Sequence, residues 1–199
     1  FQESPEPPGA PRVLFAGRLL RDKGVDTFID AARILQARGT VVTFVLCGVP
    51  DPDSPSSVTA DDIVLWVNEG LIEYLGRQTD MPGVLADSHI VTLPSRYGEG
   101  VPLILLEAAA AGKPIVTTDW PGCREVVEHE VTGLLTPPGD AEALADAITR
   151  LIQSPGLRVA YGKAARAKAV TEFADRRVFA DVTKVYQQLL ERGTSRGPC

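Results

Sequence analysis

Short apolar runs that alternate with amphipathic helical patterns are the feature that most limits the fold of this chain. The runs are rich in β-branched residues and end at glycine or proline, which is typical of strands covered on both faces. The expected strands are Arg12–Ala16, Val41–Cys47, Leu71–Leu75, His89–Leu93, Pro114–Thr118 and Gly133–Leu135. Helical spacing of the apolar residues between them predicts crossover helices. The pattern therefore predicts an α/β fold, a doubly wound parallel sheet with helices on both faces.

The strand pattern stops after Gly139, and only helical patterns follow. These predict extra C-terminal helices over Asp140–Ile152, Leu157–Thr171 and Arg177–Leu190. The proline-rich start and the polar end divide the chain into a linker at residues 1–10, one domain at residues 11–192 and a disordered tail at residues 193–199. The first residue is Phe1 and no signal-peptide pattern follows it, so we expect a piece of a longer protein.

Charge and cysteine content exclude several classes of function. The 26 acidic residues outnumber the 20 basic ones and give a net charge of −6, which argues against a nucleic-acid-binding surface. No apolar stretch approaches the roughly 20 residues of a membrane-spanning helix. The three cysteines form no CxxC pair, which favours a reducing, cytoplasmic location over a disulfide framework.

The loop after the first expected strand carries two cations. Ligands of doubly wound sheets bind beyond the carboxyl ends of the strands, so this loop, residues 17–24, is a candidate site. Arg18 and Lys23 lie five residues apart and lead into a helix N-terminus, a combination that suits a phosphate group. The alternative is ordinary solvated surface charge.

The loop after the fourth expected strand carries two glutamates eight residues apart. Glu99 lies between two glycines, and Glu107 lies within an apolar, alanine-rich helix. A carboxylate in such surroundings needs a partner. Carboxylates accept hydrogen bonds from vicinal hydroxyls, so the pair suits a ribose and a sugar. For Glu107 the alternative is a buried structural salt bridge.

Three strings of this sequence closely resemble the nucleotide-sugar-binding C-terminal domain of GT-B glycosyltransferases, in particular the retaining family GT4. They are FAGRLLRDKG, SRYGEGVPLILLEAAAAGKPIVTTDWPG and VTGLLTPPGDAEALADAI. The resemblance covers the chain from about Pro11 to Leu190. It implies that the sheet is one Rossmann-like half of a GT-B enzyme, and that the enzyme moves a sugar, with retention, from a nucleoside diphosphate to a glycan or lipid-linked acceptor.

The resemblance also implies roles for individual residues. Arg18 and Lys23 would hold the donor diphosphate, Glu99 would contact the donor sugar, and these three form the expected catalytic set. The other expected donor-binding residues are Gly17 in the phosphate loop, Gly76 near the base, Gly100 and Val101 with amides near phosphate, and Glu107 at the ribose. One departure concerns the turn after the second strand: a tight glycine-acid-glycine turn in many relatives is replaced here by Cys47-Gly48-Val49-Pro50-Asp51 and a long Pro/Ser loop.

Partners and cofactors follow from the same resemblance. The substrate would be a UDP-type or GDP-type sugar, and no metal or other cofactor is expected, because GT-B enzymes use cations in place of a metal. The acceptor site would lie on a missing N-terminal domain of the same chain, so the 199 residues alone are expected to transfer no sugar. A basic face near the C-terminus allows a peripheral contact with the inner face of a membrane. Bacterial surface polysaccharide or lipopolysaccharide synthesis is the implied pathway.

Two other classes of function remain open. A sugar-nucleotide epimerase or a phosphorylase could use the same fold, but we find neither acid-base carboxylates or histidines nor a pyridoxal lysine motif. A non-catalytic nucleotide-binding α/β module is the second alternative. A receiver-like module would carry a cluster of acids after the first strand, where this chain has Ala16-Gly17-Arg18.

Overall fold

A six-stranded parallel sheet forms the centre of the molecule. The computed structural model describes residues 1–98, 100–174, 183 and 186. Its strands are β1 (Arg12–Ala16), β2 (Thr43–Cys47), β3 (Glu73–Gly76), β4 (Ile90–Leu93), β5 (Ile115–Thr118) and β6 (Gly133–Thr136). They are arranged in the order β3-β2-β1-β4-β5-β6, and all neighbours are parallel. The predicted α/β, Rossmann-like fold class is confirmed.

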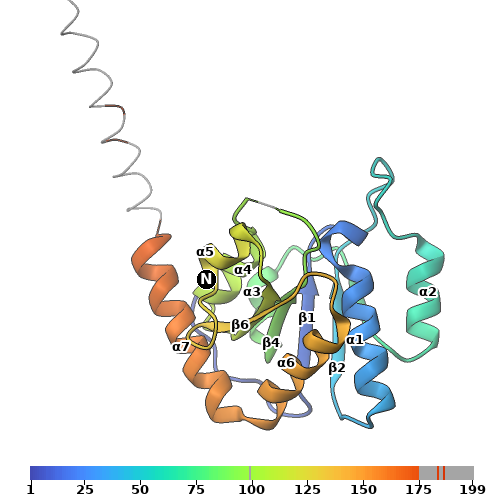
Figure 1. The fold of residues 1–199 in the computed structure, drawn as a ribbon, viewed down its shortest axis with the longest axis horizontal. Coiled ribbons are helices and arrows are strands. Elements are labelled where there is room, and N and C mark those ends of the chain that lie inside the picture. Colours follow the sequence, from blue (N-terminus) through green and yellow to red (C-terminus); the bar gives the residue numbers. More distant parts are fainter. Residues whose placement is uncertain (99, 175–182, 184–185, 187–199) are drawn as a thin grey trace, which may run out of the picture.

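Helices cover both faces of this sheet (Figure 1). They are α1 (Val25–Ala37), α2 (Ala60–Asn68), α3 (Met81–Ala86), α4 (Leu103–Ala110), α5 (Pro121–Val126), α6 (Ala141–Gln153) and α7 (Pro155–Glu172), with a single 3₁₀ turn, η1 (Arg21–Lys23), before α1. Helices α1 and α6 pack side by side on one face, and α4, α5 and α7 contact one another on the other. The sheet therefore lies inside a three-layer core.

Burial explains why the strand segments are continuous apolar runs in the sequence. Val13, Leu14 and Phe15 of β1 are fully buried, because helices cover β1 from both sides. Backbone pairing decides where β2 begins. Val41 is a β-branched residue typical of strands, but it is 74% exposed. The strand starts at Thr43, whose N–H donates to the carbonyl of Pro11. The predicted start of this strand at Val41 is thus wrong by two residues.

The residues at the helix N-terminus explain where two of the helices begin. Helix α2 begins after Thr59, whose hydroxyl accepts from the N–H of Asp62 while the Asp62 carboxylate accepts from the N–H of Thr59. Helix α7 begins at Pro155, two residues before the predicted start at Leu157, because proline is favoured in the first turn of a helix. The predicted helix Arg177–Leu190 and the predicted tail at residues 193–199 lie outside the described residues.

The proline-rich segment that precedes β1 is tied to the domain by charge. The Glu6 carboxylate accepts hydrogen bonds from Nε and Nη2 of Arg158, at 2.5 and 3.1 Å. The buried ammonium of Lys113 donates to the carbonyl oxygens of Pro5 and Ala86. The hydrogen bonds from Arg158 are the main reason that the pKa of Glu6 lies below its usual range, and nearby positive charges lower it further. The segment that we interpret as a linker is thus already hydrogen-bonded to the domain before the first strand begins.

We expect Glu6→Gln to lower the free energy of unfolding by about 1.5–3 kcal/mol, the usual contribution of a hydrogen bond to a charged group. Arg158 is almost fully buried, and the substitution leaves it the carbonyls of Leu151 and Ile152 and one neutral amide oxygen in place of the two carboxylate oxygens. Because the pKa of Glu6 is lowered in the folded state, its contribution is present at neutral pH and is lost as pH falls through that pKa.

Urea unfolding of the variant at pH 7 and in acid would measure this contribution. Glu3→Gln is the matched control, since Glu3 reaches Arg166 only at 3.8 Å and is more than half exposed. Equal stability of Glu6→Gln and the parent at pH 7 would show that the pairing of Glu6 with Arg158 contributes nothing to the fold.

Candidate functional site

A cavity of about 530 Å³ opens where the order of the strands reverses direction. Strand β1 connects to β2 on one side, while its other neighbour, β4, connects to β5, so the loops after β1 and β4 diverge and leave a crevice at their carboxyl ends. Six of the predicted site residues line this cavity: Gly17, Arg18, Lys23, Gly100, Val101 and Glu107. The fold thus brings together two loops that are about 75 residues apart in the sequence.

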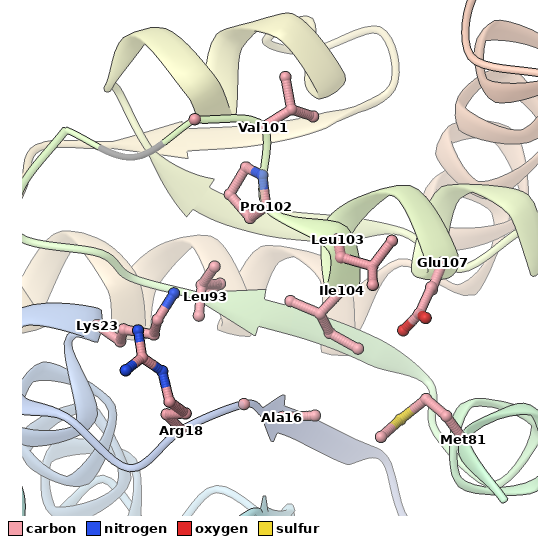
Figure 2. Close-up of a pocket in the computed structure, with 12 residues that line it drawn as sticks. Ala16, Arg18, Lys23, Met81, Leu93, Val101, Pro102, Leu103, Ile104 and Glu107 are labelled. Carbon is pink, nitrogen blue, oxygen red and sulfur yellow. The ribbon is translucent and has the colours of Figure 1, made fainter. Parts of the chain in front are cut away.

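The loop between β1 and α1 supplies the positive end of the cavity. Figure 2 shows Arg18 and Lys23 side by side on one wall. Gly24 ends the loop with a φ of 81°, and a Cβ atom there would lie 1.8 Å from the carbonyl oxygen of Pro94. Only glycine therefore fits at this position, because both the left-handed backbone and the contact with the loop after β4 exclude a side chain.

Arg21 belongs to the same loop but has a structural role. Its guanidinium bonds the carboxylates of Asp26 in α1, at 2.6 Å, and Asp62 in α2, at 2.8 Å. The hydrogen bond to Asp26 is the main reason that the pKa of Arg21 is raised. Arg21 therefore fixes the loop to two helices, while the two cations on either side of it line the cavity.

Arg18 also has a carboxylate partner. Its Nη1 donates to Oδ2 of Asp51 at 3.1 Å, and Asp51 lies in the loop between β2 and α2. This loop and the loop between β1 and α1 are closely packed, because a Cβ atom at Gly48 would lie 1.9 Å from the carbonyl oxygen of Gly17. Asp51 begins the string Asp51-Pro52-Asp53, whose two acids have the spacing of a metal-binding DxD motif. In the described part of the chain, no group of three or more histidine, cysteine or acidic side chains is placed to hold a metal ion.

Glu107 supplies the negative end of the cavity from the middle of α4 (Figure 2). Burial raises the pKa of its carboxyl group. Within the described residues, no hydrogen bond reaches this carboxylate and no arginine or lysine pairs with it; the charge of the N-terminal ammonium lowers its pKa by less than burial raises it. The partner that its apolar surroundings require is therefore not a structural salt bridge with a basic side chain of the described chain, and the carboxylate is available to a ligand.

Of the two remaining predicted residues, one lies in the described part of the chain. Gly76 ends β3, and its carbonyl oxygen accepts a hydrogen bond from the N–H of Gly48 at 2.9 Å, but it does not line the cavity. Glu99 lies outside the described residues.

An apolar floor that was not predicted from the sequence lies between the two charged ends. Met81, Leu93 and Ile104 line it, and Figure 2 places Met81 beside Glu107 and Ile104 between Glu107 and the cations. A signal was present for Ile104, which precedes Glu107 by three residues and so shares its face of the helix. Met81 opens the helix that follows β3, at the same edge of the sheet.

Comparison with known proteins shows which proteins this chain is similar to. The family described as "Glycosyl transferases group 1" matches residues 10–154 of the chain. A similar curated protein is the amylovoran biosynthesis glycosyltransferase AmsK of Erwinia amylovora, which is 33% identical over 185 residues, covering 89% of this chain and 45% of AmsK. The chain spans about half the length of the curated relatives it matches.

Solved structures share the fold. Sucrose-phosphate synthase from Thermosynechococcus elongatus superposes with a TM-score of 0.81 at 28% identity, over 92% of this chain and 46% of that enzyme. The Anabaena protein HepE, solved in complex with UDP, gives a TM-score of 0.74 at 27% identity, over 92% of this chain and 48% of HepE. Within the described residues, no helix has both the length and the apolar character needed to cross a bilayer.

Proposed function

The chain belongs to the group 1 glycosyltransferase family, and from this membership we propose that its domain binds the nucleoside diphosphate sugar that donates the transferred group. The observation that carries the proposal is the cavity with two cations at one end and an available carboxylate at the other. A nucleoside diphosphate has the matching polarity, with anionic phosphates at one end and ribose hydroxyls, which donate hydrogen bonds, at the other.

The proposed chemistry is stabilisation of the leaving group. When the bond between the sugar and the phosphate breaks, negative charge grows on the diphosphate. Arg18 and Lys23 are held beside this position before the reaction, so they stabilise the transition state more than the ground state. Glu107 would accept hydrogen bonds from the ribose and so place the diphosphate against the cations. By family resemblance, Glu99 would contact the donor sugar, and the reaction would proceed with retention.

We further propose that this domain is one half of the active protein. The coverage of about half of each relative supports a second domain that presents the acceptor. The name of AmsK connects that relative with polysaccharide biosynthesis, which supports a glycan or lipid-linked acceptor for this protein too. A bacterial cytoplasmic location with contact to the inner face of the membrane, and surface polysaccharide or lipopolysaccharide as product, belong to the same proposal.

Calorimetric titration of the chain with UDP, GDP and ADP in the presence of EDTA tests the donor site. We expect at least one of these nucleotides to bind, with an affinity that changes less than twofold when Mg²⁺ replaces EDTA, because two side-chain cations neutralise the diphosphate. The same titration identifies the base. Binding that requires Mg²⁺, or no binding of any of the three nucleotides, would overturn the proposed site.

A further inference from the structure

The loop between β2 and α2 lies along the phosphate loop and is joined to it by backbone hydrogen bonds. The N–H of Leu19 donates to the carbonyl of Val49 at 3.2 Å, and the carbonyl of Leu19 accepts from the N–H of Val58 at 3.0 Å. The N–H of Arg21 donates to the carbonyl of Ser56 at 2.7 Å. Residues 49–58 thus form a second layer behind the phosphate loop, in the stretch where this chain departs from the glycine-acid-glycine turn of many relatives.

Asp51 is the point where this second layer reaches a cavity residue. Its backbone N–H donates to Oγ of Ser57 at 2.8 Å, and its Oδ1 accepts from the N–H of Asp53 at 3.3 Å. The remaining oxygen, Oδ2, accepts from Nη1 of Arg18. The side chain of Asp51 is 25% exposed against 61% for Arg18, so the carboxylate is the fixed partner of this ion pair and the guanidinium is the freer one.

A carboxylate beside Arg18 opposes the binding of an anion there. A diphosphate must either displace Asp51 from the guanidinium or share the guanidinium with it at close range. In both cases the charge of Asp51 offsets part of the attraction between Arg18 and the phosphates. When the diphosphate leaves, Asp51 is already in place to pair with Arg18 again.

We propose that Asp51 is an internal competitor of the donor diphosphate for Arg18, and that it lowers nucleotide affinity and speeds release of the nucleoside diphosphate product. This inference rests on the proposed function, because it takes Arg18 to be a phosphate ligand. It gives the Pro/Ser-rich loop a role in setting affinity.

The test compares Asp51→Asn with the parent by calorimetry, using whichever of UDP, GDP and ADP binds. Asparagine keeps the side-chain oxygen that accepts from the N–H of Asp53, so the loop retains its turn. We expect an increase in affinity of about two- to fivefold, the range that an exposed ion pair can contribute. Stopped-flow displacement of the nucleotide should show a correspondingly slower dissociation. Unchanged or weaker affinity of Asp51→Asn would overturn the inference.

Two further variants separate a local effect from a general change in charge. Asp53→Asn is the matched control, since it removes the same charge from the same loop and no contact joins the Asp53 side chain to Arg18. It should leave affinity unchanged. In an Arg18→Ala background, Asp51→Asn should also have no effect, and a gain that persists there would refute competition for Arg18. If Arg18→Ala binds as well as the parent, or if no nucleotide binds at all, the proposed phosphate site itself fails.

Discussion

Replacing Lys23 with alanine in the complete protein is expected to lower the rate of sugar transfer by about 10²–10³-fold, the usual effect of removing one group that stabilises developing charge. Lys23 lines the cavity beside Arg18, where the diphosphate charge would grow during the reaction. The affinity for the free nucleotide should fall less, by about tenfold to a hundredfold, because one charge-assisted hydrogen bond contributes roughly 1.5–3 kcal/mol. Steady-state kinetics at saturating donor, with calorimetry on the same variant, separate the two effects.

Arg33→Ala is a suitable control for the Lys23 variant. Arg33 lies on the exposed side of α1, pairs with Asp30 and Glu69, and does not line the cavity, so its removal changes net charge equally without touching the site. If Lys23→Ala transfers sugar as fast as Arg33→Ala does, the leaving group does not lie beside Lys23.

Glu107→Gln is expected to weaken nucleotide binding by about tenfold to a hundredfold while leaving the domain as stable as the parent or more so. The loss of affinity follows because a neutral amide accepts weaker hydrogen bonds from the ribose hydroxyls than a carboxylate does. The stability follows from burial, which raises the pKa of Glu107. An acid with a raised pKa stabilises the fold when protonated, and this contribution is lost as pH rises through the folded-state pKa.

Melting temperature and affinity measured together distinguish the two roles of Glu107. A structural ion pair would cost about 3–5 kcal/mol on substitution, because a buried cation would lose its partner. A melting temperature several degrees lower, with unchanged affinity, would therefore assign Glu107 to the fold. Inorganic pyrophosphate is the matched ligand, since it lacks the ribose and should bind the parent and Glu107→Gln equally. Nucleotide binding should also strengthen as pH rises through the Glu107 pKa, because the carboxylate is the better acceptor.

Local patterns were enough to predict most of the fold and the main side chains of the cavity. All strands except the edge strand β3 are recognisable because they are mostly buried by helices on both faces. Glu107 stands out because a carboxylate in an alanine-rich helix has no local partner. Asp51 and Glu6 could not be found in this way. Asp51 is 33 residues from Arg18, and Glu6 is 152 residues from Arg158. Such pairs form only when folding brings distant segments together. The periodicity of apolar residues within one segment carries no information about them.

The close contacts between loops described above also bear on how the site can be changed. The carbonyl of Gly17 would clash with any side chain at Gly48, and the carbonyl of Pro94 with any side chain at Gly24. The carbonyl of Ser95 in turn accepts from the hydroxyl of Thr118 at the end of β5. The loops after β1, β2 and β4 and the end of β5 are therefore joined in one continuous series of contacts. Exchanging a single loop with a relative would disturb its neighbours, so altered donor preference would have to be transplanted as a set of loops.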